Sequence, residues 1–358
     1  MSSPMVSLLM SVYNGERYLR EAIESILDQA FSDFEFIIVD DCSTDNTPEI
    51  LKKYAKLDKR INLLHNNRNL GPFHSHNRSI KVACGKYLAI LDADDVSLPR
   101  RLASQVRFLE EHPEVGVLGT WVAYLNENNR LTGIWQPHTL PSLVRWSMLF
   151  SNPLAHSSVM MRRSLVKSGV AYRPEVLYSG DYDLWFRLSE KTELANLPDF
   201  LCLRRVHKEM ITARHYEQQE QTHITIMRQI LLKLLGKDVP DRLITSFRKA
   251  SKKELLDTGE ELRAVTILIR NLYQAYVLHY GLSNEERKQV AEDASRRLML
   301  LAMQHLVCRP ITSFRVILQA LCLNRRILPK SYIRKAVRAH AFRKKCSTFQ
   351  AKAVKHDT

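Results

Sequence analysis

The sequence predicts an α/β fold with a largely parallel central sheet flanked by helices, followed by a helical C-terminal extension. Over the first hundred residues short apolar runs alternate with segments of helical periodicity, which is typical of βαβ units. Past residue 212 helical periodicity dominates, to about residue 340, and glycine becomes rare. We therefore predict one domain over residues 1–212 and a helical region over residues 213–358.

Composition sets the class of protein. A chain of 358 residues with 45% hydrophobic content is long enough for about two domains with a sizeable core. The 6 cysteines are far apart, form no CxxC pair and follow no secretory signal, so we expect reduced thiols in a cytoplasmic protein. The longest apolar runs, such as residues 298–308, fall short of the roughly 20 residues that span a bilayer, and no transmembrane helix is predicted.

The strands and helices of the first domain are predicted in strict alternation. In chain order they are strand Val6–Val12, helix Arg17–Gln29, strand Phe34–Val39, a helix starting at Thr47, strand Ile61–Leu64, helix Phe73–Cys84 and strand Lys86–Leu91. Thr47 is the expected N-cap of the second helix because Pro48 suits the first helical position. Gly85 is the expected C-cap of the third.

Later elements are read from the same patterns. Residues 99–111 are apolar at helical spacing, and "VGVLG" and "TWVAYL" after them indicate two short strands. In the C-terminal region "GKDVPD" (Gly236–Asp241) and "GLSN" (Gly281–Asn284) are predicted to be turns between helices.

The stretch "LDADD" (Leu91–Asp95) follows the predicted strand Lys86–Leu91 directly. On an extended backbone Asp92 and Asp94 would point to the same side, with Ala93 leaving room between them. Two carboxylates on one side suit a hard divalent cation such as Mg²⁺ or Mn²⁺, which would offset their repulsion. The alternative is that these acids cap the following helix or are solvated in a loop.

A second acidic pair favours a binding site at this edge. Asp40 and Asp41 follow the strand Phe34–Val39, and ligands of open α/β sheets bind beyond the carboxyl ends of the strands. None of the 11 glycines forms a GxG motif and no GK[ST] motif occurs, so a nucleotide bound here would be held through a metal and side chains.

Together, the motifs of residues 10–95 resemble the nucleotide-sugar-binding half of family 2 glycosyltransferases, which have the GT-A fold. The resemblance covers about residues 5–212, and several motifs occur in the family's order: "SVYN", "VDD" and "LDADD". It implies that Ser11 and Tyr13 line the nucleobase site and that Asp41 accepts a hydrogen bond from the base. "LDADD" matches the DxD motif, which implies donor and metal binding by Asp92 and Asp94, with Asp95 as a competing metal ligand.

Sugar transfer with inversion also needs a carboxylate that takes the proton of the acceptor hydroxyl. "SGDYDLWFRL" (Ser179–Leu188) resembles the family's "ED" motif and makes Asp181 the candidate base, with Asp183 as the nearest rival. The alternative for Asp181 is an ordinary helix N-cap. Gly180 departs from the family, which usually has an acid at that position.

Softer matches concern the leaving diphosphate and the acceptor. "LRRVHKEMIT" resembles the family's Arg-x-His segment, which implies that His207, with Arg204 or Arg205, faces the diphosphate. His156 matches a position near the acceptor. His76 stands where the family commonly has an arginine that contacts phosphate. No QxxRW motif occurs, which favours a single-addition enzyme over a processive synthase.

The charge lies mostly in the C-terminal region. Residues 301–358 hold thirteen Lys and Arg and one acid, Asp357, or +12 of the net +15, which leaves +3 for residues 1–300. Aliphatic runs mixed with arginine are typical of interfacial helices on an anionic membrane, although a soluble helical subdomain fits equally. Nucleic-acid binding is not expected, because aromatic residues are sparse in this region and no binding motif occurs.

The sequence thus predicts an inverting, metal-dependent glycosyltransferase that uses a nucleotide-sugar donor. The expected acceptor is a glycan or a lipid-linked molecule at the cytoplasmic face of the membrane, as in cell-surface polysaccharide or lipopolysaccharide assembly. One alternative is a nucleotidyltransferase, which also uses paired aspartates but normally has a basic or glycine-rich loop near its N-terminus. Another is an inactive nucleotide-sugar-binding scaffold, which the departures at Gly180 and His76 leave open.

Overall fold

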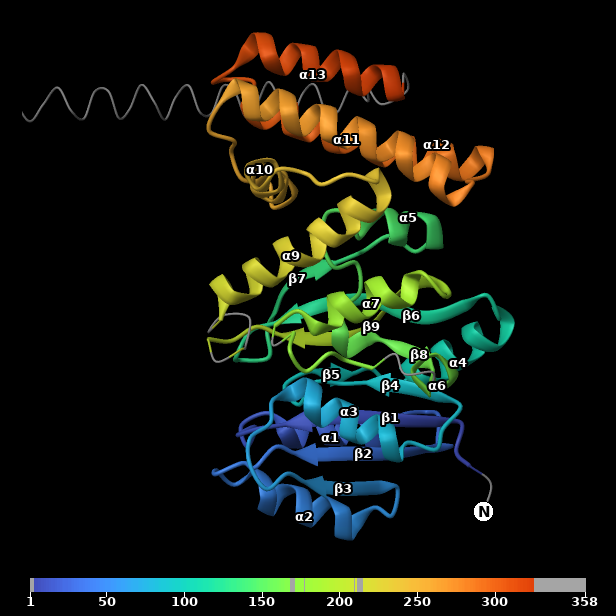
Figure 1. Cartoon of the computed structure of the whole chain (residues 1–358). Helices are drawn as coiled ribbons and strands as arrows, with labels where there is room; N and C mark the ends of the chain where they lie inside the picture. The colour runs from blue at the N-terminus through green and yellow to red at the C-terminus, as the bar shows by residue number, and fades with distance from the viewer. Residues whose placement is uncertain (1–2, 168–170, 177, 209, 211–214, 325–358) are drawn as a thin grey trace, which may run out of the picture. The chain divides into compact units, whose positions relative to one another are not determined.

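A computed structural model describes residues 3–167, 171–176, 178–208, 210 and 215–324 of the chain (Figure 1). These residues divide into two compact units, Met1–Met227 and Arg228–Thr358, as far as each is described. The predicted domain boundary at residue 212 lies outside the described residues and stays a prediction. The described residues also do not include the predicted helix beyond residue 324 or Cys346. Of the thirteen basic residues of the C-terminal region, they include only Arg309 and Arg315.

The first unit is built on one nine-stranded sheet in the order β3-β2-β1-β4-β8-β6-β9-β5, with β7 paired to β6. The strands are β1 (Val6–Val12), β2 (Phe34–Asp40), β3 (Ile61–His65), β4 (Tyr87–Ile90), β5 (Val96–Ser97), β6 (Val115–Leu125), β7 (Leu131–Trp135), β8 (Met160–Arg162) and β9 (Glu193–Arg205). The four N-terminal strands pair in parallel, as predicted, whereas β8 joins β4 and β6 in antiparallel fashion. The α/β class with a helical C-terminal region is confirmed.

Helices cover the sheet because each has one apolar face. The helices of this unit are α1 (Leu19–Leu27), α2 (Thr47–Leu57), α3 (Pro72–Val82), α4 (Arg101–Glu111), α5 (Pro141–Ser147), the short 3₁₀ helix η1 (His156–Ser158), α6 (Arg163–Lys167) and α7 (Gly180–Ser189). In α1 the buried side chains are Leu19, Ala22, Ile23 and Ile26, at the spacing of a single helix face. Figure 1 shows α3 alongside β1 and β2, on which it packs.

Three local predictions were wrong, each because a distant contact decides the conformation. Asn46, not Thr47, is the N-cap of α2, and the Thr47 hydroxyl instead accepts a hydrogen bond from the Gly15 amide at 2.9 Å. The cap of α3 is Ala83, and Gly85 allows close approach, since a Cβ there would lie 2.4 Å from the Ser7 nitrogen.

The third wrong prediction concerns strand β6. The two short strands expected over residues 115–119 and 120–125 form one continuous strand. Gly119 does not interrupt it. A Cβ at this position would lie 2.2 Å from Asn196 Oδ1 of the neighbouring β9, so the glycine allows the two strands to pack closely.

The second unit is helical. Its helices are the C-terminal end of α9 (Tyr216–Leu235), α10 (Asp241–Ser251), α11 (Gly259–Tyr280), α12 (Asn284–His305) and α13 (Pro310–Leu323). The two turns predicted from sequence lie between α9 and α10 and between α11 and α12, and Gly236 and Gly281 have positive φ angles there. Capping boxes begin α11 and α12. Among the described residues, no helix is both long and apolar enough to cross a membrane.

Candidate active site at the carboxyl edge of the sheet

The segment after β4 turns sharply instead of continuing as an extended strand. The strand ends at Ile90, and the Asp95 amide donates a hydrogen bond to the Asp92 carbonyl oxygen at 3.2 Å, closing a turn over Ala93 and Asp94. The prediction that Asp92 and Asp94 share one side of an extended backbone was therefore wrong. Each of the three aspartates instead meets its own set of partners.

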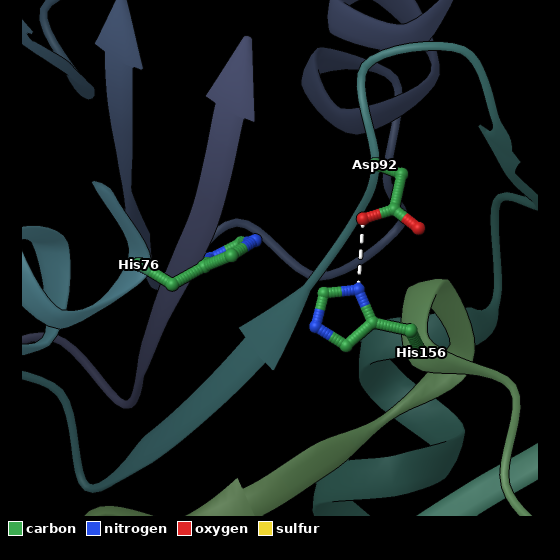
Figure 2. Close-up of side chains that lie close together, drawn as sticks. All are labelled: His76, Asp92 and His156. Atoms are coloured by element: carbon green, nitrogen blue, oxygen red, sulfur yellow. Dashed lines mark hydrogen bonds and ion pairs between the residues drawn. The ribbon is translucent and has the colours of Figure 1, made fainter. Parts of the chain in front are cut away.

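Asp92 is paired with His156, at the start of η1. Its Oδ1 lies 2.8 Å from His156 Nδ1, and its Oδ2 accepts a hydrogen bond from the Ser157 hydroxyl at 2.8 Å (Figure 2). Burial alone would raise the pKa of Asp92, but His156 and these hydrogen bonds lower it below its usual range. Burial alone would lower the pKa of His156, but the Asp92 carboxylate raises it. Each of the two groups therefore favours the charged form of the other, as in an ion pair.

Asp95 is buried, and its surroundings favour the protonated form of its carboxyl group. Burial and the charges of Asp94 and Asp92 hold its pKa well above the usual range. The hydrogen-bond pattern agrees, because the Ser157 hydroxyl lies within hydrogen-bond distance of both Asp92 Oδ2 and Asp95 Oδ2 yet carries one proton. If that proton goes to Asp92, Asp95 must supply the proton of the second bond. Asp95 Oδ1 accepts from the Arg205 amide at 2.7 Å.

Asp94 meets His207, which lies beyond the end of β9. Asp94 Oδ2 is 2.9 Å from His207 Nε2, so the structure brings together two residues that the sequence singled out separately. The Asp94 side chain is 31% exposed, and among the described residues its Oδ1 has no hydrogen-bond partner. Asp94 is therefore the acid of this cluster that keeps a free oxygen facing outward.

Two neighbouring arginines of β9 have different surroundings. Arg205 is buried: its Nε donates to the Asp94 carbonyl oxygen at 3.0 Å, and its Nη2 pairs with Glu21 at 2.7 Å. Arg204 makes no hydrogen bond or ion pair with a described residue. Burial would lower the pKa of Arg204, but the nearby Asp95, Tyr124, Asp92 and Asp181 raise it, so its charge lies among the acids of the site.

The acidic pair Asp40 and Asp41, at the end of β2, lies at the same carboxyl edge of the sheet as Asp92. Asp41 is buried, and its carboxylate holds the following loop by accepting hydrogen bonds from Asn66 Nδ2, the Leu70 amide and the Gly71 amide. The Asp41 amide donates to the Val12 carbonyl oxygen at 2.8 Å, which ties it to the end of β1. Asp40 lies 3.1 Å from His65 Nδ1.

Two further candidates lie on β1 and just beyond it. Ser11 is half-buried within the strand, and Tyr13 follows the strand with half of its surface exposed. Both therefore lie near Asp41, which the Val12 carbonyl holds at the end of the same strand. The structure thus brings together the three residues that the resemblance assigned to the nucleobase.

Asp181 and Asp183 both lie in the first turn of α7, but in different environments. Asp181 Oδ2 accepts a hydrogen bond from Asn152 Nδ2 at 2.7 Å, and the Asp181 charge contributes to the raised pKa of His156. Asp183 is buried and pairs with Arg187 Nε at 2.8 Å and with Arg173 Nη1 at 3.4 Å. Only Asp181 is thus placed among the groups around Asp92.

The backbone just before Asp181 is in a rare conformation. Ser179 has φ 61° and ψ 27°, a left-handed conformation that costs a residue with a side chain about 1–3 kcal/mol. Its side chain is buried, and its hydroxyl has no hydrogen-bond partner among the described residues. The strained residue is the N-cap of α7, two positions before Asp181.

The departure at Gly180 has a steric cause. A Cβ at this position would lie 2.6 Å from Cε2 of Phe73, on α3, so the ring occupies the space that a side chain at position 180 would need. The Phe73 ring stacks on Tyr172, with ring centroids 5.1 Å apart. An acid at position 180 is therefore incompatible with Phe73 in this orientation.

Gly180→Ala is expected to destabilise the protein by about 1–3 kcal/mol, because the added methyl group overlaps the Phe73 ring. In a Phe73→Ala background the same change should be neutral or stabilising, since alanine favours the helix over glycine by about 1 kcal/mol. Urea denaturation of the four proteins of this double-mutant cycle measures the coupling. Equal effects of Gly180→Ala in both backgrounds would contradict the steric explanation.

Sequence reasoning missed several residues of the site. Tyr172 donates to or accepts from His156 Nε2 at 2.9 Å, Ser157 bridges Asp92 and Asp95, and Asn152 holds Asp181. Ser157 could have been suspected from its place beside His156. Tyr172 and Asn152 carry no sequence signal, because long-range contacts alone bring them to the site.

Comparison with known proteins agrees with this fold. Residues 7–169 match the family model described as "Glycosyl transferase family 2". An uncharacterized glycosyltransferase of Methanocaldococcus jannaschii is 35% identical over 231 residues, which cover 63% of this chain and 79% of that protein.

Two solved structures share the fold at low sequence identity. TarS of S. aureus, in complex with UDP-GlcNAc, has a TM-score of 0.54 at 19% identity over 88% of this chain and 90% of its own. The mannosyltransferase PcManGT from Pyrobaculum calidifontis, in complex with GDP-Man and Mn²⁺, has a TM-score of 0.52 at 18% identity over 89% and 88%. The chain therefore belongs to glycosyltransferase family 2 and has the GT-A fold.

Proposed function

We propose that this glycosyltransferase is an inverting enzyme that moves a sugar from a nucleotide-diphosphate donor to a hydroxyl group of a glycan or lipid-linked acceptor. The observation that carries the proposal is the meeting of acids from two distant segments. Asp92 follows β4, Asp181 begins α7, and both raise the pKa values of His156 and Arg204. A donor diphosphate near Asp92 would thus lie within reach of a base at Asp181.

The donor would lie along the carboxyl edge, with its nucleobase near Ser11, Tyr13 and Asp41. Tyr13 offers an exposed ring for stacking. The Asp41 carboxylate accepts three hydrogen bonds from the loop and has about four acceptor sites, which leaves one for the base. The complexes of TarS with UDP-GlcNAc and of PcManGT with GDP-Man support a nucleotide sugar as the donor class.

A divalent Mn²⁺ or Mg²⁺ ion fits the oxygen donors of this edge. Asp94 would be its principal ligand because its Oδ1 is free among the described residues, and Asp92, whose side chain is 38% exposed, would be the second. Asp95, the third candidate, is buried and has a raised pKa, and we assign it to positioning the turn. When bound, such an ion stabilises the charge of a leaving diphosphate.

The residues of the chain would divide the remaining work between them. Asp181, held by Asn152, would remove the proton of the acceptor hydroxyl as the sugar carbon is attacked. The unpaired charge of Arg204 and the His207 ring beside Asp94 would face the diphosphate as the sugar–phosphate bond breaks. Asp183 would hold α7 in place through Arg187.

A panel of nucleotide sugars tests this function and identifies the donor. Thermal unfolding of the full chain with UDP-, GDP-, dTDP- and CMP-sugars, with and without Mn²⁺, should reveal one group whose stabilisation depends on the ion. The selected donor is then incubated with the protein, and release of its nucleotide diphosphate with inversion at the sugar carbon is followed by NMR. Pyrophosphate release instead would indicate a nucleotidyltransferase.

We also propose that the enzyme works at an anionic membrane surface, such as the cytoplasmic leaflet. Helix α13 exposes Ile311, Phe314 and Leu318, which recur at helical spacing, while Ser313, Val316 and Ala320 on its other side are buried. No acid occurs in residues 310–323, and residues 301–358 carry +12. An apolar helix face with basic residues beside it suits an anionic bilayer and would bring the site near a lipid-linked acceptor.

Replacing Phe314 and Leu318 by serine should weaken binding to anionic vesicles about 10-fold or more, because two apolar side chains no longer enter the interface. Co-sedimentation with phosphatidylglycerol vesicles measures this, and neutral phosphatidylcholine vesicles should bind weakly throughout. The matched control replaces the exposed Ile267 and Leu278 of α11 by serine and should bind as the wild type does. Unchanged sedimentation of the α13 variant would contradict this surface.

A further inference from the structure

His76, Asp92 and His156 come from three separate elements and converge on one point. His76 lies on α3, Asp92 in the turn after β4 and His156 in η1, and one potential ligand atom of each lies within 4.8 Å of the others. Figure 2 shows the His76 ring directed toward the Asp92–His156 pair. The two imidazole rings meet edge-on, with centroids 5.1 Å apart.

The His76 ring forms no hydrogen bond with any residue that the structure describes. Only 2% of this residue is exposed, and its Nδ1 has no partner among the described residues. A buried ring nitrogen left unpaired is unfavourable, and each such atom in a native structure needs an explanation. Because the ring is directed toward a carboxylate and a second imidazole, a cation shared by all three side chains would give this buried ring a partner.

Neighbouring residues fix the orientation of His156. Its Nε2 lies 2.9 Å from the Tyr172 hydroxyl, so its Nδ1 is the nitrogen that faces Asp92. The Tyr172 backbone is held by the Asn77 side chain. Asn77 Nδ2 donates to the Tyr172 carbonyl oxygen at 2.7 Å, and the Tyr172 amide donates to Asn77 Oδ1 at 3.0 Å. Ligating histidines in metal sites are typically oriented in this way by a hydrogen bond from the other ring nitrogen.

We propose that His76, Asp92 and His156 bind a divalent transition-metal ion, with Zn²⁺ as the best match, at a second site that shares Asp92 with the oxygen-ligated site at Asp94. Two imidazoles and one carboxylate are a donor set of catalytic-type zinc sites and leave positions for water or another ligand. With ligands at about 2.0–2.1 Å in a tetrahedral arrangement, ligand atoms around Zn²⁺ lie about 3.3 Å apart, so atoms that lie up to 4.8 Å apart here must approach by up to about 1.5 Å when the ion binds.

Binding of this ion has a consequence for the neighbouring site. The ion would replace the hydrogen bond between His156 Nδ1 and Asp92 Oδ1 and would engage a carboxylate that we assign to the donor's Mn²⁺. Zn²⁺ should therefore compete with Mn²⁺-dependent donor binding. The metal site itself does not depend on the proposed function, whereas this competition does.

The test uses the full chain freed of metal. Titration with Co²⁺, read by the visible absorption of cobalt with nitrogen ligands, followed by displacement with Zn²⁺, should show one site per chain. His76→Gln should weaken Co²⁺ and Zn²⁺ affinity at least about 10-fold. His74→Gln is the matched control, since His74 is exposed on the same helix, and it should bind as the wild type does.

A variant at Asp94 separates the two proposals. Asp94→Asn should retain Co²⁺ and Zn²⁺ binding while losing Mn²⁺-dependent donor binding. His76→Gln should lose Co²⁺ and Zn²⁺ affinity while retaining Mn²⁺-dependent donor binding. Wild-type Co²⁺ affinity in folded His76→Gln, or an equal loss in His74→Gln, would overturn the zinc site. If His76→Gln does not fold, His76→Asn serves in the same measurements. Failure of donor binding in every protein, with Co²⁺ binding intact in the wild type, would overturn the proposed function alone.

Discussion

Asp181→Asn should lower kcat by about 10²- to 10⁴-fold while leaving the affinity for the donor unchanged. Asparagine has nearly the same shape and can still accept the hydrogen bond from Asn152, but it cannot take a proton from the acceptor hydroxyl. Donor affinity is measured by calorimetry with Mn²⁺ present, and kcat by release of the nucleotide diphosphate at saturating acceptor.

Asp183→Asn is the matched control, two positions further along the same helix. Asp183 is buried and paired with Arg187 at 2.8 Å, so its replacement should cost about 3 kcal/mol of unfolding free energy. The folded fraction should keep most of its kcat. Near-normal turnover in Asp181→Asn, together with an inactive but folded Asp183→Asn, would move the base to Asp183.

Asp94→Asn should abolish the dependence of donor binding on Mn²⁺, with donor affinity at least about 100-fold weaker. The reason is that the free Oδ1 of Asp94 is the best-placed oxygen for the ion, and an amide carries no charge to hold it. Titration with the donor in the presence of Mn²⁺ and in the presence of a chelator measures the difference. Chelation should weaken binding to the wild type to the level of the variant.

Asp95→Asn controls for simple disturbance of the turn. Because the raised pKa of Asp95 favours the protonated acid, an amide at this position should donate to Ser157 and accept from the Arg205 amide in the same way. Donor affinity should change by less than about 3-fold, which is under 1 kcal/mol. Loss of Mn²⁺-dependent binding in Asp95→Asn, with Asp94→Asn unaffected, would reassign the ion to Asp95.

Most of the N-terminal sheet could be predicted because its signals are local. The strand Phe34–Asp40 is apolar along nearly its whole length, as expected for a parallel strand covered on both faces, and α1 shows its buried face as an apolar repeat. These patterns need no knowledge of distant residues. The placement of Asp41 and Asp92 at one edge follows from strand order, whereas Asp181, on α7, was implied only by the resemblance.

The details of the site could not be predicted because they depend on contacts between distant residues. The turn at Asp92–Asp95 is held by Ser157 and by Arg205, which lie at least 62 residues away in sequence. Local sequence therefore favoured an extended segment, and the opposite environments of Asp94 and Asp95 were hidden. The partners of Asp181 and Asp183, which separate a candidate base from a structural acid, were hidden for the same reason.

The contact between Phe73 and position 180 restricts the order in which this site could have changed during evolution. A glutamate could not appear at position 180 while the aromatic ring stayed in place, so a descendant with that acid must first, or at the same time, acquire a smaller residue at position 73. Because the ring also supports Tyr172, such a descendant would have to hold His156 by another route. Enzymes with glycine at position 180 and enzymes with glutamate there should therefore differ at several linked positions. Sequences that carry only some of these substitutions should be rare.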